Sequence, residues 1–427
     1  MKRYIAIFLF IPFASLASAQ DIEFADYFKD ATMRVDYFHT ADATSDEIAV
    51  DQICINDVWA GNPNQLLPST ENGRYAIKVF DVASDQLIYC RQYLDIVFEY
   101  KGEEPATEGI KQTYHQTALI PCPKKAIRFT IERRDKRNVL HSVFSRIIDP
   151  EDRSIKHEPP SPRDQSFAIL ENGRPHDCVD LVFVAEGYTL EEFDKFKTDS
   201  QRFTDYLFTL EPFASTKEKF NIHGVFRASA QSGVDIPAES VYKNTVMDVS
   251  YDTFGSARYA TVFDNKTMRD IASKVPYDHV IVLANTPEYG GGGFYNSYTL
   301  FTSDNPRSAE IFTHELGHGL AGLADEYIAE SYFNVYYTRG VEPLEPNITA
   351  YLDPDDLKWS HLLTPDAPLP TPAEEEHAET VGLFEGAGYT QTGMYRSGLH
   401  CVMGAGGLPF CKACQEAIRN AIDEYAN

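Results

Sequence analysis

Two histidines and a glutamate on one predicted helix are the residues best suited to chemistry in this chain. The segment reads His314-Glu315-Leu316-Gly317-His318. Residues four apart lie one turn apart on a helix face, so the two imidazoles can bind one tetrahedral zinc ion. Glu315 lies beside the metal rather than on the ligand face. Its carboxylate can accept a proton from activated water and deliver it to a leaving amine, so the pattern predicts zinc-dependent hydrolysis of peptide bonds.

The third zinc ligand must come from outside this helix. Gly322 is expected to end the helix, since glycine readily adopts the left-handed conformation of a helix C-terminus. Asp325, seven residues after His318, can then turn back towards the metal, and we predict it as the third ligand. Its nearest rival is its neighbour Glu326, and three carboxylates later in the chain are more remote candidates: Glu342, Glu345 and Glu385.

The helix that carries these residues is expected to run from Pro306 to about Leu323. Asn305 suits the N-cap position and Pro306 the first helical position. Glycines lower helix stability by about 1 kcal/mol each, which fits a helix that a metal and a substrate approach closely. An apolar face towards a core is predicted for Phe312, Leu316, Leu320 and Leu323, and the glycines are Gly317, Gly319 and Gly322.

Strand and helix patterns alternate before this helix, which is typical of an α/β domain. The run Gly290–Gly293 is expected to be a loop, and a strand is expected from Phe294 to Phe301. The other predicted elements are strands at Val179–Ala185, Phe220–Phe226 and His279–Ala284, and a helix from Leu190 to Leu210.

Residues 20–157 show short alternating strands and almost no helical periodicity, so we expect a β-sandwich accessory domain. Residues 158–165 form a proline-rich linker, and residues 166–427 form the zinc peptidase domain. The fold class is therefore a two-domain α+β/α/β protein. The strands expected in the first domain are Met33–Phe38, Tyr75–Phe80, Asp95–Tyr100, Ala126–Glu132 and Val139–Ile148.

Near the C-terminus, a compact apolar turn at residues 400–404 contains Met403, and Pro409 then begins a helix that continues to the end of the chain. The pair Cys411-x-x-Cys414 is compatible with a disulfide, a redox pair or half a zinc site. No second Cys-x-x-Cys pair exists to complete it, so core packing or a disulfide is the favoured interpretation.

The first 19 residues have the pattern of a signal peptide. Lys2 and Arg3 precede a largely apolar stretch, and Ala17-Ser18-Ala19 is a small-residue cleavage site. We therefore expect secretion after cleavage near Ala19. No later stretch has 18 consecutive apolar residues, so no membrane span is predicted. The net charge of −26 disfavours nucleic-acid binding. The expected partner is a protein or glycoprotein substrate, because the predicted chemistry is hydrolysis of peptide bonds.

Several motifs together resemble the bacterial IgA-peptidase family of metallopeptidases, which are metzincin-like zinc enzymes. The resemblance rests on Thr313–His318, Gly322–Tyr327, Leu383–Tyr389, Met394–Arg396, Cys401–Met403, Pro409–Cys414 and, upstream, Thr32–Tyr37.

The resemblance implies a zinc endopeptidase with a β-rich N-terminal domain. It makes His314 and His318 zinc ligands and Glu315 the general base, and it puts a turn at Met403 beneath the metal. It also suggests that Phe294–Phe301 is an edge strand that aligns substrate, and that a tyrosine stabilises the oxyanion: Tyr327, Tyr389 or Tyr395. The chain departs from the metzincin pattern, which has glycine and histidine where this sequence has Ala321 and Ala324.

Two other functions are compatible with these patterns. One is a non-catalytic secreted protein that binds a protein or glycan and contains a structural zinc site. Structural zinc is usually closed by four protein ligands, whereas catalytic zinc keeps one position open. The other is a metal-dependent amidase with the same chemistry and a smaller substrate.

Overall fold

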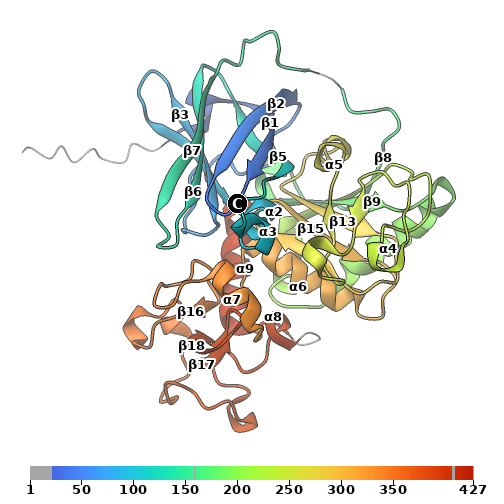
Figure 1. Ribbon diagram of the computed structural model, residues 1–427. Coiled ribbons are helices and arrows are strands. Elements are labelled where there is room, and N and C mark those ends of the chain that lie inside the picture. The colour runs from blue at the N-terminus through green and yellow to red at the C-terminus, as the bar shows by residue number, and fades with distance from the viewer. Residues whose placement is uncertain (1–21, 158, 406–408, 427) are drawn as a thin grey trace, which may run out of the picture.

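The protein was analysed as a computed structural model that describes residues 22–157, 159–405 and 409–426. The predicted signal peptide lies outside these residues. Figure 1 shows an N-terminal β domain, a central α/β region and a C-terminal region of short strands and helices. Among the described residues, no helix is both long and apolar enough to cross a bilayer.

The N-terminal domain consists of two antiparallel sheets that share one apolar core. Alternate side chains of β1, such as Met33 and Val35, point into that core and meet Val79 and Phe129 from the other sheet. One sheet has the order β2-β1-β5 and the other β4-β3-β6-β7, with bounds β1 (Phe28–Ala41), β2 (Asp46–Asn56), β3 (Tyr75–Asp81), β4 (Leu87–Tyr93), β5 (Gln112–Pro123), β6 (Ile127–Arg134) and β7 (Leu140–Ile148). The domain also has α1 (Phe24–Tyr27), α2 (Ile96–Tyr100) and α3 (Glu104–Thr107).

One strand predicted in this domain is wrong. Asp95–Tyr100 is not a strand, because Asp95 acts as the N-cap of the short helix α2 and its carboxylate accepts a hydrogen bond from the Phe98 N–H at 3.2 Å. This difference matters because α2 carries a side chain to the candidate site.

The central region is a six-stranded sheet in the order β14-β15-β13-β9-β10-β8. The four inner strands are parallel, and β8 and β14 are antiparallel edges. The predicted strands at Phe220–Phe226 and His279–Ala284 are confirmed. The bounds are β8 (Gln165–Leu170), β9 (Val179–Glu186), β10 (Phe220–Phe226), β13 (His279–Ala284), β14 (Gly291–Phe294) and β15 (Tyr298–Thr302), beside the small pair β11 (Val249–Ser250) and β12 (Thr261–Val262).

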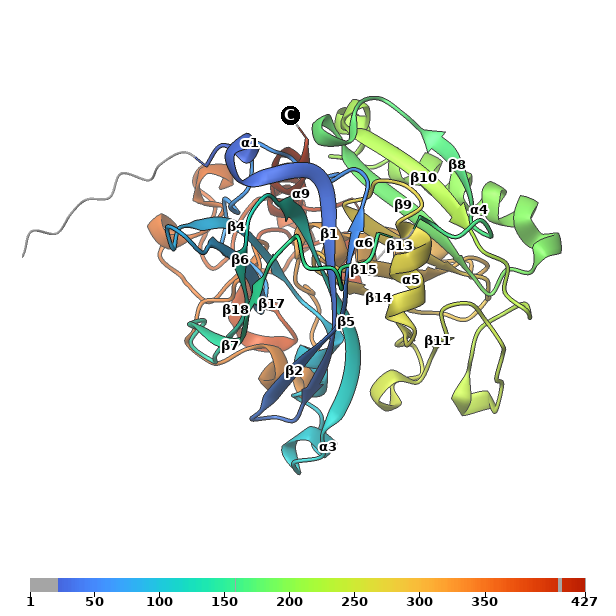
Figure 2. The same ribbon diagram turned by 90° about the horizontal axis from the view of Figure 1, so that it is seen from above.

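Both faces of this sheet are covered. On β9, Leu181 and Phe183 face a core formed with α4 (Phe193–Leu207), α6 (Ser308–Ala321) and α9 (Lys412–Tyr425). The alternate residues Val182 and Val184 face α5 (Asn265–Ala272) on the other side. Strand β5 of the N-terminal domain runs beside α5 (Figure 2), where the Asn265 amide donates to the Thr117 hydroxyl at 3.1 Å. The N-terminal domain is therefore packed against the sheet.

The remaining elements form the C-terminal region in Figure 1. Its three-stranded sheet has the order β16-β18-β17, and its core includes Tyr389 and Met394. The elements are α7 (Glu330–Tyr336), β16 (Ile348–Thr349), β17 (Phe384–Ala387), β18 (Thr390–Arg396) and α8 (Val402–Ala405). This region and α9 surround the chain that leaves the C-terminus of α6.

The glycine run was expected to be a loop, but Gly291–Phe294 is edge strand β14. The predicted strand Phe294–Phe301 is instead a hairpin, in which β14 turns into β15. The reason lies in the packing of β14 against α6: a Cβ on Gly293 would lie 2.3 Å from the Glu315 carbonyl oxygen. Only glycine allows the strand to cross the helix so closely.

We predict that Gly293→Ala lowers the stability of the protein by about 3 kcal/mol, because its methyl group would meet backbone that cannot rotate away. Gly109→Ala is the control, since a Cβ there meets nothing within 4 Å although φ is +85°. The control should lose only about 1–2 kcal/mol, the cost of a left-handed residue. Thermal and denaturant unfolding would measure both, and equal losses would contradict the close crossing.

Candidate active site

Helix α6 ends as the sequence predicts and directs the chain back over its own histidines. Gly322 is the C-cap with φ +60°, and its N–H donates to the His318 carbonyl at 3.0 Å. The helix begins at Ser308 rather than Pro306, because the Asn305 side chain accepts from the Arg307 N–H at 3.0 Å and holds a turn before the helix. The chain after Gly322 brings Asp325 to the histidine face.

Three ligand atoms converge on one point. The Nε2 atoms of His314 and His318 are 3.1 Å apart. Oδ1 of Asp325 lies 3.1 Å from the first and 3.4 Å from the second. A tetrahedral zinc ion with ligands about 2.0–2.1 Å away separates them by about 3.3–3.4 Å. The triangle therefore has the size of one face of a zinc coordination tetrahedron.

Asp325 supports the same interpretation. The residue is 5% exposed, and its Oδ1 makes no well-aligned hydrogen bond although it is buried. A buried carboxylate oxygen without a partner is unfavourable unless a cation compensates its charge. The residues present therefore fit a metal ion.

Outer contacts orient all three ligand groups. The Nδ1 of His314 lies 3.1 Å from the Val402 carbonyl, and the Nδ1 of His318 lies 2.6 Å from the Leu323 carbonyl. A carbonyl only accepts, so each Nδ1 carries the proton and each Nε2 keeps a lone pair for a metal. The Tyr389 hydroxyl donates to Oδ2 of Asp325 at 2.5 Å, which leaves Oδ1 for the metal.

The charges of the three groups depend on one another. Burial disfavours the charged imidazoles, but Asp325 outweighs this effect and raises the pKa of His318 to about 9 and that of His314 in the same direction. Burial also disfavours ionised Asp325, yet the histidines hold its pKa well below the usual range. The site thus stabilises an anion by adjacent positive charge. Without a metal, protonated imidazoles supply this positive charge. A bound divalent cation would supply it instead, and both imidazoles would then be neutral.

A cavity of about 690 Å³ opens over the triangle, and all three residues line it. Glu315 also lines the cavity. Burial raises the pKa of the Glu315 carboxyl group, and the neighbouring histidines partly oppose this shift. Tyrosines are frequent among the lining residues, namely Tyr259, Tyr289, Tyr295, Tyr327, Tyr332, Tyr336, Tyr337 and Tyr389.

The N-terminal domain forms part of the same wall. The Asn72 amide donates to the Gly322 carbonyl at 3.3 Å, so this domain caps the C-terminus of α6. Arg74 forms an ion pair with Glu345 at 3.0 Å, and both line the cavity. Glu99 of α2 accepts a hydrogen bond from the Tyr259 hydroxyl, and burial raises its pKa to about 7. Glu345 is one of the remote ligand candidates from the sequence, but the sequence interpretation missed the other residues of this wall, since nothing in their local pattern indicates a contact across domains.

The other carboxylates considered as third ligands have other partners. Glu345 lines the cavity but forms the ion pair with Arg74. Glu326 faces away from the histidines and contacts Cys414. Glu342 accepts from the Ala350 N–H at 2.8 Å, and Glu385 accepts from the Gly393 N–H at 3.0 Å. Among the described residues, the possible metal-binding cluster that contains both histidines includes one carboxylate, that of Asp325.

The turn at Met403 lies against α6. Met403 is fully buried, and a Cβ on Gly317 would lie 2.9 Å from its sulfur. The sulfur therefore packs against α6 at Gly317, which lies between the two histidines in the sequence. The Met403 carbonyl accepts from the Glu326 N–H at 2.9 Å. Of the tyrosines considered for oxyanion stabilisation, Tyr327 and Tyr389 line the cavity, whereas the Tyr395 hydroxyl contacts Glu385 at 3.4 Å.

Comparison with known families covers most of the chain. The family model described as IgA Peptidase M64 matches residues 167–378 and 373–422, and the model described as Peptidase M64 N-terminus matches residues 23–145. A search of curated proteins found no match. The two matches correspond to an N-terminal domain followed by a peptidase domain. The chain therefore belongs to the M64 family of IgA peptidases, and it is a peptidase.

Proposed function

We propose that this peptidase is an exported zinc endopeptidase that cuts proteins or glycoproteins, with His314, His318 and Asp325 as zinc ligands. The observation that carries the proposal is the triangle of ligand atoms beneath an open cavity, with Glu315 on the same wall. Three protein ligands leave a coordination position for water or substrate, as in catalytic zinc sites. A non-catalytic protein with a structural zinc ion would need a fourth protein ligand on the cavity side.

Zinc, when bound, supplies Lewis acidity that activates water and polarises a carbonyl group. A carboxylate oxygen of Glu315 accepts the proton of the attacking water and then delivers it to the nitrogen of the leaving amine. The Nδ1–H groups of His314 and His318 remain bonded to carbonyl oxygens, which holds both rings in position throughout. Tyr389 keeps the Asp325 carboxylate oriented by its bond to Oδ2.

Tyr327 is proposed as the group that stabilises the oxyanion. It lines the cavity, whereas the Tyr389 hydroxyl is already bonded to Asp325 and Tyr395 lies outside the cavity lining. A phenol hydroxyl directed at the developing negative charge lowers the activation barrier more than it strengthens substrate binding.

The finer fold assignments belong to the same proposal. Two sheets around one core support a β-sandwich for the N-terminal domain, and the Met403 turn against α6 supports a metzincin-like peptidase domain. Export is proposed from the N-terminal charge and apolar pattern alone. A mature protein that still begins at Met1, measured by intact mass, would contradict export.

We predict that Glu315→Gln retains zinc but lowers kcat by at least about 100-fold, because the amide cannot accept the proton of water. Protease assays on a panel of proteins and glycoproteins, with metal analysis of the same samples, would measure this. Glu191→Gln, a change at an exposed residue that does not line the cavity, is the control. Full proteolysis by Glu315→Gln would remove this residue from its role.

We predict that Asp325→Asn weakens zinc binding strongly and that Tyr389→Phe weakens it by about 10–100-fold, because the phenol orients the ligating carboxylate. Competition with a chelator would measure both affinities. Tyr395→Phe should leave zinc affinity at the wild-type value. If Asp325→Asn bound zinc as tightly as the wild type, another residue would have to be the third ligand.

We predict that Tyr327→Phe lowers kcat by about 100-fold with little change in KM or zinc content. The loss should appear in the turnover step because the hydroxyl acts on charge that develops during reaction. Tyr395→Phe again provides the matched control. A rise in KM at constant kcat would instead mean that Tyr327 only binds substrate.

A further inference from the structure

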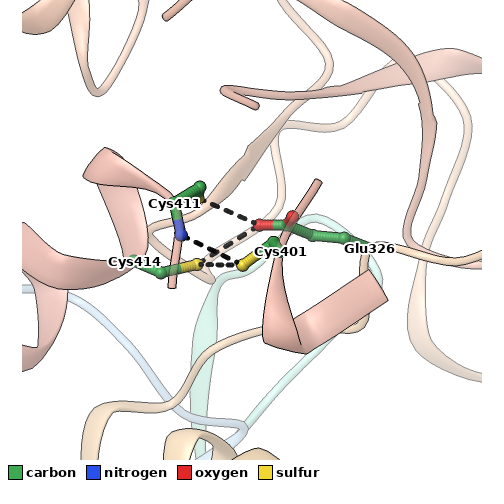
Figure 3. Close-up of side chains that lie close together, drawn as sticks. All are labelled: Glu326, Cys401, Cys411 and Cys414. Atoms are coloured by element: carbon green, nitrogen blue, oxygen red, sulfur yellow. Dashed lines mark hydrogen bonds between the residues drawn. The ribbon is translucent and has the colours of Figure 1, made fainter. Parts of the chain in front are cut away.

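A second cluster of possible metal ligands lies behind the candidate active site. It consists of Glu326, Cys401, Cys411 and Cys414, whose side chains point toward one another in Figure 3. One ligand atom from each residue lies within 4.8 Å of all the others. Cys401 precedes α8, and Cys411 is the N-cap residue of α9, so three separate segments of the chain meet here.

The spacing differs from that of a disulfide and resembles that of a zinc site. The sulfur atoms of Cys401 and Cys414 are 3.7 Å apart, whereas a disulfide needs about 2.0 Å. A tetrahedral zinc ion with Zn–S bonds of about 2.3 Å separates two sulfurs by about 3.8 Å. The Glu326 Oε1 atom lies 3.2 Å from the Cys414 sulfur and 3.7 Å from the Cys411 sulfur, close to the sulfur–oxygen separation of such a site.

Burial makes this cluster unfavourable without a cation. Glu326 is 3% exposed, and its Oε2 atom is buried with no hydrogen-bond partner. Cys401 and Cys414 are also buried, at 2% and 0% exposure. A carboxylate that is removed from water and placed among thiols has an unfavourable free energy unless a cation or a proton compensates its charge.

The surrounding groups are arranged as around a thiolate metal site. The Cys411 N–H donates to the Cys401 sulfur at 3.3 Å, and the Ser397 hydroxyl donates to the Cys411 sulfur at 3.2 Å. The Asn347 amide donates to Oε1 of Glu326 at 2.9 Å. Donors of this kind stabilise anionic ligands and fix their orientation.

We propose that Glu326, Cys401, Cys411 and Cys414 bind a second, structural zinc ion. Four protein ligands close the site, and three thiolates favour zinc over the hard cations that carboxylates prefer. Binding releases the thiol protons to solvent and involves no redox step. The site is separate from the proposed catalytic site, and it does not depend on the roles proposed for His314, His318 or Asp325.

This ion would stabilise the backbone that orients the catalytic ligands. Glu326 directly follows Asp325, and its N–H donates to the Met403 carbonyl at 2.9 Å. Cys401 directly precedes Val402, whose carbonyl binds the Nδ1 of His314. A zinc ion between Glu326 and Cys401 would therefore connect the segments that hold Asp325 and His314 in place.

Metal analysis and X-ray absorption on the full chain, purified with reductant and without chelator, test the proposal. We expect about two zinc ions per chain and a zinc–sulfur distance of about 2.3 Å. The double variant His314→Ala/His318→Ala should keep the sulfur-bound ion and lose the other. Cys411→Ser should lose the sulfur signal, whereas Cys54→Ser, in strand β2, should keep it.

A measurement on the wild type covers the case in which Cys411→Ser does not fold. Replacement of zinc by cobalt(II) should give an intense thiolate-to-cobalt charge-transfer absorption. Its absence, or, in protein purified without reductant, a native mass lower by two hydrogens from a disulfide between Cys401 and Cys414, would overturn the proposal. Wild-type protein with only sulfur-bound zinc would contradict the catalytic site instead, so the two proposals fail separately.

Discussion

The candidate active site depends on three potential ligand atoms that lie within about 3.4 Å of one another. The Nε2 atoms of His314 and His318 are 3.1 Å apart, and the negatively charged Oδ1 atom of Asp325 lies next to both. This close approach is favourable only if a positive charge lies between the three atoms. Each is held by a contact from a different part of the chain: a carbonyl next to the Met403 turn, a carbonyl just after α6 and the Tyr389 hydroxyl. The described part of the C-terminal region therefore orients the proposed zinc ligands, although the three candidate ligands lie on α6 and in the segment that follows it.

The N-terminal domain is equally tied to this centre. Asn72 caps the last turn of α6, and Glu99 and Arg74 line the cavity. A helix end that lacks such a partner leaves its carbonyl groups unsatisfied, so removal of the domain would expose the end of the helix that carries both histidines. The accessory domain thus contributes to the shape of the substrate cavity and to the order of the helix beneath it.

The sequence predicts those features that depend on local spacing. The separation of His314 and His318 follows from helix geometry, and Gly322 is recognisable as a helix end, so the position of Asp325 follows from reach. The errors arise where a distant segment decides the conformation. Gly291–Gly293 forms a strand rather than a loop because β14 crosses α6, and no local pattern contains that contact. Asp95 begins a helix rather than a strand because its side chain caps it, a signal weaker than the apolar alternation around it.

The cysteine cluster illustrates the same limit. Cys411 and Cys414 are close in sequence and were recognised as a pair, but their partners come from a position 85 residues away, Glu326, and from Cys401. From the sequence alone, Asp325 and Glu326 are rivals for one ligand position. The fold instead turns these neighbours in opposite directions, one towards the histidines and the other towards the thiols. Because adjacent residues share one peptide unit, contacts that fix the backbone at Glu326 also restrict the backbone at Asp325, so each cluster constrains the geometry of the other.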